Sequence, residues 1–427
     1  MTNFQSLSPQ QLQEIKSTLW ERYRQFRSRK ITLDMTRGKP CAEQLDLALG
    51  MLDSTDGIHY LAEDGTDCRN YGGLDGIPEA RALFAAYMGV GVDEIIIGAS
   101  SSLNMMHDTF MRAMVNGVTE NTTPWMKQPH VKFLCPSPGY DRHFFICEYL
   151  GIEMITVDIN DDGPDMDCIE DLVANDDSIK GIWCVPKFSN PTGIVYADEV
   201  VDRLANMNVK AQDFRIFWDN AYAVHDLEDT PAELKNILSA CKQAGNADRV
   251  LMWGSTSKIS FAGSGIAMMA GSKANMEHAK RQMAFQTIGP DKLNQLRHVR
   301  FFKTMAGIED HMQKHAAILK PKFDAVQTSL ENELGGKNIA EWSKPRGGYF
   351  VSLNTMEGCA GAVVDLAAEA GVKLTPAGST FPYKKDPLDR NIRIAPSFPP
   401  LEDIQQAMEL VGICIQMVSI DKLLPSQ

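Results

Sequence analysis

The chain has 427 residues, of which 44% are hydrophobic and 23% charged, and this globular composition excludes a disordered or low-complexity chain. Its 42 Lys and Arg against 55 Asp and Glu give a net charge of -13, which provides no overall electrostatic affinity for nucleic acid. No run reaches the ~18 apolar residues of a membrane helix, and no signal-peptide pattern opens the chain. Nine scattered Cys without a C-x-x-C pair favour reduced thiols, and we expect a cytoplasmic protein.

The first predicted element is a helix. Ser8 suits its N-cap and Pro9 its first turn. An apolar stripe with helical spacing follows at Leu12, Ile15, Leu19, Tyr23 and Phe26.

From about residue 92, short apolar runs alternate with helix-length segments. The runs cover residues 95–97, 131–135, 153–157, 179–185, 214–218 and 249–253. Continuous apolar strands separated by helices indicate a parallel sheet covered on both faces. Ligands bind such sheets beyond the carboxyl ends of the strands, so reactive residues are expected directly after each run.

The pattern changes near residue 325 to one typical of a smaller α+β domain. Strands are predicted at 348–353 and 391–395, and helices at 361–370 and 401–419. The expected division is residues 1–60 as an N-terminal helix, arm and part of the small domain, 61–325 as the large domain and 326–427 as the C-terminal small domain.

Three polar motifs follow predicted strands. In Gly254-Ser-Thr-Ser-Lys258, a desolvated lysine would lose its proton readily and act as a nucleophile that forms a Schiff base, although a surface lysine is the simpler interpretation. Asp219 in Phe217-Trp-Asp-Asn-Ala-Tyr222 could pair with a cationic ring, or cap a helix. Asn190 in Asn-Pro-Thr-Gly could present its amide rigidly to a ligand, or simply belong to a turn.

A fourth motif, Asn391-Ile-Arg393-Ile-Ala-Pro, places an arginine among apolar residues of a strand. Its planar fork suits bidentate binding of a carboxylate, with a structural ion pair as the alternative.

The ordered set of these residues, over roughly residues 34–400, resembles the fold-type I pyridoxal-phosphate aminotransferases of the aspartate aminotransferase superfamily. The wording around Lys258 and Asn190 is similar to an atypical bacterial branch that resembles the effector domain of MocR-type regulators. The resemblance also includes Asn70-Tyr-Gly-Gly73, Gly98-Ala-Ser-Ser-Ser102 and Pro136-Ser-Pro-Gly-Tyr140. It implies an α/β fold with a large domain, whose mostly parallel seven-stranded sheet is covered by helices, and a smaller α+β domain.

The resemblance implies a role for each motif around the cofactor ring. Lys258 would form a Schiff base with pyridoxal phosphate and shuttle the substrate proton. Asp219 would pair with the ring nitrogen and keep it cationic, which makes the ring a better electron sink. Asn190 and Tyr222 would hold the phenolate oxygen, and Tyr140 would stack on the ring.

The phosphate site is also implied by resemblance. Ser100, Ser101 and Ser102 would open a helix whose N-terminus takes the phosphate, and Ser255 and Ser257 would add hydroxyls. Tyr71 would reach the phosphate from the partner subunit of a homodimer with shared active sites. The chain departs from the pattern in one respect, because residues 259–266 lack the arginine that many family members aim at the phosphate.

The implied substrates are an amino acid and a 2-oxo acid, which exchange an amino group by a ping-pong mechanism. Arg393 would clamp the α-carboxylate, and Gly38, Asn190 and Arg37 would contact the substrate. Aspartate with 2-oxoglutarate is the expected pair, motivated by the family branch and by spare cations for a distal carboxylate at Arg37, Lys39, Arg142 and Lys187.

Several alternatives remain open. Other pyridoxal-phosphate chemistry, such as a β-lyase, or an aminotransferase of other specificity would use the same fold. A non-catalytic effector-sensing protein is disfavoured, because only about 33 residues precede the first motif and the chain is acidic. Nucleotide-binding fingerprints and metal-ligand spacings are missing from the sequence, so no metal is expected.

Overall fold

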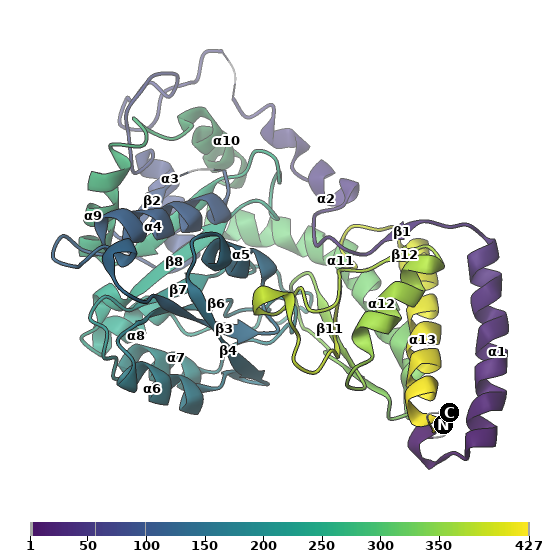
Figure 1. Cartoon of the computed structure of the whole chain (residues 1–427). Helices are drawn as coiled ribbons and strands as arrows, with labels where there is room; N and C mark the ends of the chain where they lie inside the picture. Colours follow the sequence, from purple (N-terminus) through teal and green to yellow (C-terminus); the bar gives the residue numbers. More distant parts are fainter. Residues whose placement is uncertain (1–2, 56, 99, 426–427) are drawn as a thin grey trace.

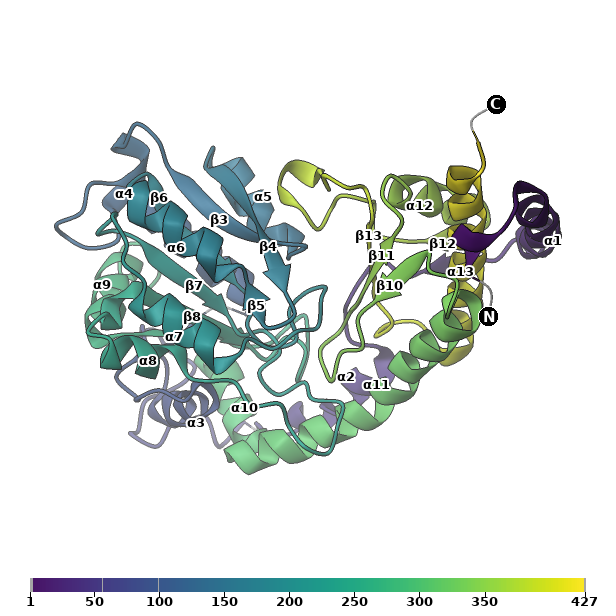
Figure 2. The same ribbon diagram turned by 90° about the horizontal axis from the view of Figure 1, so that it is seen from below.

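Two lobes of unequal size make up the chain in the computed structural model, which describes residues 3–55, 57–98 and 100–425. Helix α11 (Met305–Leu334) runs from the larger lobe to the smaller one (Figures 1 and 2). The predicted boundary at residue 325 falls within this helix, and the division into domains stays a prediction.

The larger lobe is built on a sheet with the strand order β2-β9-β8-β7-β6-β3-β4-β5. Within it, β9 and the two-residue β5 run against their neighbours and the other strands run parallel. The predicted mostly parallel sheet is confirmed, with β5 added at one edge. The strands are β2 (Ile95–Ile97), β3 (Lys132–Ser137), β4 (Glu153–Asn160), β5 (Gly163–Pro164), β6 (Ile179–Cys184), β7 (Arg215–Asp219), β8 (Val250–Ser255) and β9 (Ala267–Gly271).

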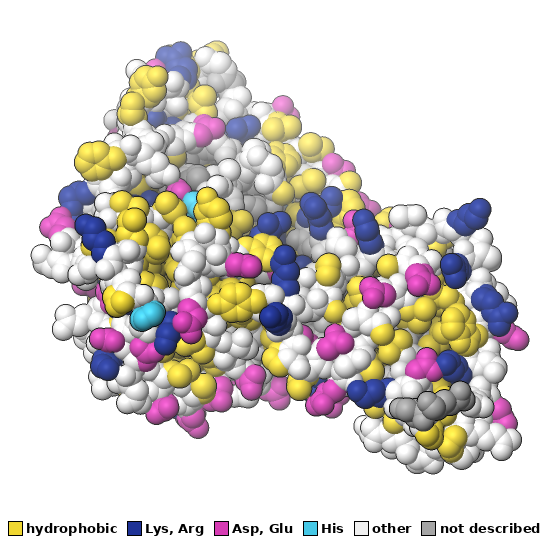
Figure 3. All heavy atoms as spheres, viewed as in Figure 1, with side chains coloured by type: hydrophobic (Ala, Val, Ile, Leu, Met, Phe, Trp, Pro, Cys, Tyr) yellow, Lys and Arg dark blue, Asp and Glu magenta, His cyan; other side chains and the backbone are white. Residues whose placement is uncertain are grey.

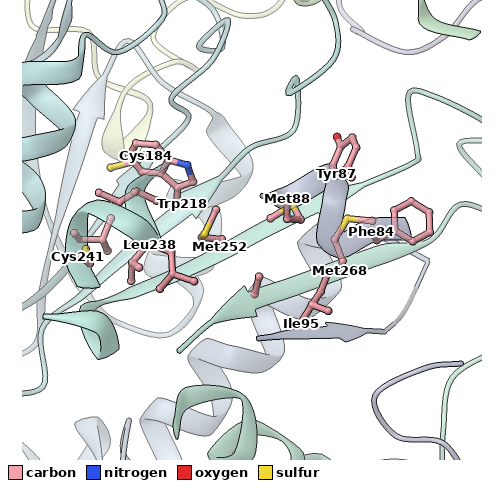
Figure 4. Close-up of a cluster of buried hydrophobic side chains, with 14 of the residues drawn as sticks. Phe84, Tyr87, Met88, Ile95, Cys184, Trp218, Leu238, Cys241, Met252 and Met268 are labelled. Atoms are coloured by element: carbon pink, nitrogen blue, oxygen red, sulfur yellow. The ribbon is translucent and has the colours of Figure 1, made fainter. Parts of the chain in front are cut away.

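Helices bury both faces of this sheet. Successive side chains of a strand point to opposite faces, so Trp218 joins one core cluster while Phe217 joins the other. Figure 4 shows the first cluster, in which Phe84 and Tyr87 approach strands β8 and β9. The helices of this lobe are α3 (Pro78–Met88), α4 (Ser102–Asn116), α5 (Asp141–Tyr149), α6 (Met166–Asn175), α7 (Asp198–Asn206), α8 (Ile237–Gln243), α9 (Lys273–Met283) and α10 (Lys292–Phe302).

The smaller lobe has its own apolar core around a three-stranded antiparallel sheet and a parallel strand pair. The antiparallel strands are β10 (Ala340–Trp342), β11 (Val351–Thr355) and β13 (Asn391–Ile394), and the pair is β1 (Leu33–Asp34) with β12 (Val372–Lys373). Its helices are α1 (Pro9–Ser28), α2 (Ala42–Asp46), α12 (Ala360–Glu369) and α13 (Leu401–Leu423). Short 3-10 helices cover Phe4–Ser6, Leu49–Met51, Trp125–Lys127, Ala247–Arg249 and Pro382–Lys384.

Helix α1 forms as its sequence predicts. Ser8 and Gln11 exchange side-chain and backbone hydrogen bonds in a capping box, which satisfies two free backbone N–H groups at the helix start. The apolar stripe is buried at Leu12, Leu19, Tyr23 and Phe26, and α1 packs beside α13. Among the described residues, none of the helices is long and apolar enough to cross a membrane.

Candidate active site

Lys258 lies in a tight turn directly after β8, at the carboxyl end of the parallel strands. Its Nζ is 4.8 Å from the centre of the Tyr222 ring and 5.9 Å from that of Tyr349. Burial lowers the pKa of Lys258, and the charge of Asp219 opposes part of that shift. A lysine that loses its proton more easily than usual is suited to attack a carbonyl carbon.

Asp219 ends the neighbouring strand β7 and is 2% exposed. Its Oδ2 is 3.0 Å from Nε2 of His143, whereas its Oδ1 is buried without a hydrogen-bond partner among the described residues. A buried acceptor without a partner costs free energy unless a ligand satisfies it. The ring N–H of a pyridoxal phosphate fits this oxygen, because it supplies both a donor and a positive charge.

His143 is a site residue that the motifs did not single out. It lies on α5, is 1% exposed, and stacks on Trp183 with ring centres 4.0 Å apart and planes 5° apart. This stack fixes the imidazole that holds Asp219. A signal was present in the sequence, because His143 follows Tyr140 by three residues, about one helical turn.

Tyr222 and Tyr140 lie within electrostatic range of the Asp219 carboxylate, and Asn190 lies beside Arg393. Burial raises the pKa of Tyr222 and of Tyr140 well above the usual value, so both phenols stay protonated and able to donate. Asn190 is 3% exposed, and its Oδ1 lies 3.5 Å from Nη1 of Arg393. The structure therefore brings the strand-end motifs of the larger lobe into contact with the arginine of the smaller lobe.

Arg393 lies on β13, opposite Ser352 of β11, and is buried. Its Nη1 donates to Oδ1 of Asp141 at 3.3 Å and its Nη2 to Oγ1 of Thr375 at 3.4 Å. Its Nε is buried and finds no partner among the described residues. The ion pair that the sequence left open as an alternative is therefore present, and a donor remains for a ligand.

The expected phosphate site brings two loops together. Ser101 caps α4 by accepting a hydrogen bond from the backbone N–H of Leu103, and Ser102 is the first residue of that helix. Oγ of Ser257 lies 3.4 Å from the carbonyl oxygen of Ser100. Ser255 is buried at the end of β8. A helix N-terminus lined with hydroxyls is suited to a phosphate; Ala99 of the same motif lies outside the described residues.

Gly38 lies against the smaller lobe, where a Cβ would come within 2.3 Å of the Phe350 ring. No larger residue fits without moving that ring. Among the spare cations, Lys187 is buried and donates to Asp226 at 2.8 Å, so it has a structural partner already. Arg37, Lys39 and Arg142 are exposed, and Figure 3 shows Lys and Arg side chains gathering where the lobes meet.

Tyr71 is 81% exposed. Its loop is nevertheless held firmly, because buried Lys292 donates to the carbonyl oxygens of Asn70 at 2.6 Å and Gly72 at 2.7 Å. A rigidly held but exposed tyrosine is available to a neighbouring molecule.

The site has a lysine and a carboxylate at the ends of adjacent strands of a mostly parallel sheet, and the smaller lobe supplies an arginine. This arrangement defines the class of fold-type I pyridoxal-phosphate enzymes. The solved structure of an α-aminoadipate aminotransferase from Thermus thermophilus, complexed with N-(5'-phosphopyridoxyl)-L-leucine, shares this fold. Its TM-score is 0.73 at 19% identity, over 91% of this chain and 92% of that one.

The chain belongs to the aspartate aminotransferase family, whose model matches residues 7–427. It is 44% identical to an aspartate aminotransferase of Corynebacterium glutamicum over 400 residues, which cover 94% of this chain and 92% of that protein. A crystal structure of an aspartate transaminase from Corynebacterium glutamicum superposes with a TM-score of 0.97 at 42% identity and covers 99% of each chain. The predicted family, aminotransferase activity and pyridoxal phosphate cofactor are thereby confirmed.

Proposed function

We propose that this aminotransferase moves the amino group of L-aspartate to 2-oxoglutarate by a ping-pong mechanism. The observation that carries the chemistry is Oδ1 of Asp219, which has no hydrogen-bond partner in the described part of the chain, near a lysine with a lowered pKa. The amino donor is inferred from the relative of Corynebacterium glutamicum, which is named for aspartate. Arg37, Lys39 and Arg142 are the exposed cations available for a distal carboxylate.

Each site residue has a distinct task in this proposal. Bound pyridoxal phosphate supplies an electron sink that stabilises negative charge on the substrate Cα. Lys258 holds the cofactor and, once its amine is free, accepts and returns the Cα proton. Asp219, fixed by His143, keeps a proton on the ring nitrogen. Arg393 binds the α-carboxylate through its fork.

The remaining residues hold the cofactor in place. Asn190 and Tyr222 would bind the phenolate oxygen, and Tyr140 would stack on the ring. Gly38 allows the close approach of the Phe350 ring, which a Cβ at that position would strike, and its backbone would contact the substrate. The hydroxyls of Ser100, Ser101, Ser102, Ser255 and Ser257 and the N-terminus of α4 would hold the phosphate.

The working form in this proposal is a homodimer. Tyr71 is too exposed to serve its own site, and a tyrosine from the partner would complete a phosphate site whose loop lacks the usual arginine. The free cysteines, all buried except Cys168, support a reducing location such as the cytoplasm. The net charge of -13 supports small-molecule substrates rather than nucleic acid.

The deciding experiment is an absorption titration of the purified protein loaded with pyridoxal phosphate. Aspartate should convert the visible cofactor band to the amino form, and 2-oxoglutarate should restore it. A band that responds only to other amino acids would support aminotransferase activity but contradict aspartate as the amino donor. Lys258→Ala should abolish the lysine-linked band, while Lys273→Ala, at an exposed lysine on α9, should leave it unchanged.

A further inference from the structure

The turn that carries Lys258 is surrounded by four buried histidines. They are His225, His298, His311 and His315, each at most 5% exposed. None of them belongs to the motifs that predicted the site. Buried polar side chains are expensive unless they are hydrogen-bonded, so the partners of these rings indicate their purpose.

The carbonyl oxygen of Lys258 itself is held from two directions. Nε2 of His225 lies 3.3 Å from it, and the phenol of Tyr349 donates to it at 3.4 Å. A carbonyl oxygen only accepts hydrogen bonds, so Nε2 of His225 carries the proton. Tyr349 lies just before β11 of the smaller lobe, which means that both lobes contact the backbone of the lysine.

The next carbonyl along the turn is held by α11. Nε2 of His311 lies 2.8 Å from the carbonyl oxygen of Ile259 and therefore donates to it. His315 lies one helical turn further along α11, with its Nε2 3.1 Å from that of His311. It also faces the Ile259 carbonyl, so the Nε2–H groups of both histidines point at one acceptor. Two consecutive carbonyls, those of Lys258 and Ile259, are thus fixed by side chains from three separate segments.

Gln44 connects His315 to Tyr349. Its Oε1 accepts from the backbone N–H of Cys41 at 3.1 Å, which orients the amide. Its Nε2 then faces Nδ1 of His315 at 2.9 Å and donates to the Tyr349 phenol at 2.9 Å. Gln44 is fully buried, and it lies on α2, next to α11.

We propose that Gln44, His311, His315 and Tyr349 form a positioning relay that fixes the backbone of Lys258 relative to the smaller lobe. The relay rests on the proposed role of Lys258. Arg393, which would hold the substrate carboxylate, lies on β13 beside β11 of that lobe. The relay therefore sets the distance between the amine that moves the proton and the cation that orients the substrate.

This positioning matters because proton transfer needs close alignment. A misplacement of about 1 Å can cost about 10²-fold in rate even when the altered residue never touches the substrate. Substrate affinity, by contrast, depends on Arg393 and its neighbours. Substitutions in the relay do not alter these residues. Loss of the relay should thus lower kcat more than it raises KM.

The test compares His311→Leu, His311→Gln and Tyr349→Phe in the holoenzyme. His311→Leu removes the donor to Ile259, and we expect kcat with aspartate to fall about 10- to 100-fold while KM changes less than about threefold. The amide of Gln can replace the imidazole N–H, so His311→Gln should recover most of that loss. Tyr349→Phe should lower kcat less, because His225 still holds the Lys258 carbonyl.

A second readout separates positioning from general stability. The pH midpoint of the visible cofactor band reports the environment of the Lys258 nitrogen that is bonded to the cofactor, and it should shift in His311→Leu and return in His311→Gln. His278→Gln, at a half-buried histidine on α9 whose Nε2 lies 2.8 Å from Nε2 of Gln282 on the same helix, is the matched control and should leave the midpoint unchanged.

Three outcomes overturn the relay or its foundation. If all three variants keep the wild-type kcat and band midpoint and only their melting temperature falls, these residues contribute to core packing and do not position Lys258. An equal fall of kcat in His311→Leu and His311→Gln would exclude the hydrogen bond as the cause. If His311→Leu does not fold, the kcat and band midpoint of Tyr349→Phe and His311→Gln test the relay by themselves. A wild-type holoenzyme without any response to aspartate would instead contradict the proposed function.

Discussion

Among single residues, Asp141 sets the charge around the proposed substrate clamp. Its carboxylate lies 3.3 Å from Nη1 of Arg393, in the region where a substrate carboxylate would bind. It orients the guanidinium before substrate arrives, but it also competes for the same donor. Two carboxylates on one cation repel each other, so Asp141 should weaken substrate binding.

Asp141→Asn should therefore lower KM for the amino donor. We expect a fall of about fivefold, or on the order of 1 kcal/mol, with little change in kcat because Lys258 is unaffected. Steady-state kinetics with aspartate check this value. Glu148→Gln, an exposed charge change on the same helix α5, is the control. A higher KM in Asp141→Asn would show that orientation of Arg393 outweighs competition.

Among the secondary-structure elements, helix α10 supports the turn after β8 together with α11. Nδ1 of His298 lies 2.8 Å from the carbonyl oxygen of Asn294 and donates to it, which leaves Nε2 as an acceptor for the hydroxyl of Ser260 at 2.8 Å. Burial lowers the pKa of His298 to about 4. Protonation of this ring would place a positive charge in the core and force the hydrogen bond to Ser260 to reverse its direction.

This neutral histidine makes the protein sensitive to acid. The unfolded chain binds a proton near pH 6.5 and the folded chain only near pH 4. Between these values the unfolded state holds more protons, so stability rises with pH and is lost on acidification. From pH 6.5 to pH 5, His298 alone should cost about 2 kcal/mol of unfolding free energy.

His298→Gln should remove that share of the acid sensitivity. Thermal unfolding midpoints at pH 7 and pH 5 should differ less in this variant than in the wild type, even if its midpoint at pH 7 is lower. His130→Gln, at an exposed histidine, should retain the full difference. An unchanged pH dependence in His298→Gln would mean that folding does not lower the pKa of His298.

The sequence pattern predicted most strands of the large sheet and the polar residues that follow them. Lys258, Asp219 and Asn190 were found because each follows an apolar run, and strand ends meet at one edge of a parallel sheet. Strand β9 was not predicted, because its short apolar run lies within one long apolar segment that also contains the lysine turn. Periodicity alone does not divide such a segment.

For the molecule as a whole, Tyr71 predicts a shared active site. It is exposed, yet its loop is anchored by Lys292. If it binds phosphate across a dimer interface, each site needs Lys258 from one subunit and Tyr71 from the other. Lys258→Ala and Tyr71→Ala homodimers should both be nearly inactive.

Mixing these two variants should restore activity. Heterodimers contain one site with both residues intact, and random exchange of subunits should give about a quarter of the wild-type activity. The measurement is activity after co-refolding or co-expression of the two variants. A mixture of each variant with itself is the control. No recovery, with dimers shown by sedimentation, would place Tyr71 outside the neighbouring site.

The linear sequence was enough to predict the fold class and the family, which are confirmed, and to propose the residues of the site. Apolar runs, caps and the ordered motifs from Asn190 to Arg393 depend on local periodicity and chain order, which a single sequence displays. Only the tertiary structure shows which side chains of the site contact one another. His143 beneath Asp219, Asp141 on Arg393 and the histidines behind Lys258 come from segments far apart in the chain or carry no motif. Their pairing depends on packing between lobes, and local pattern does not encode distances across a core.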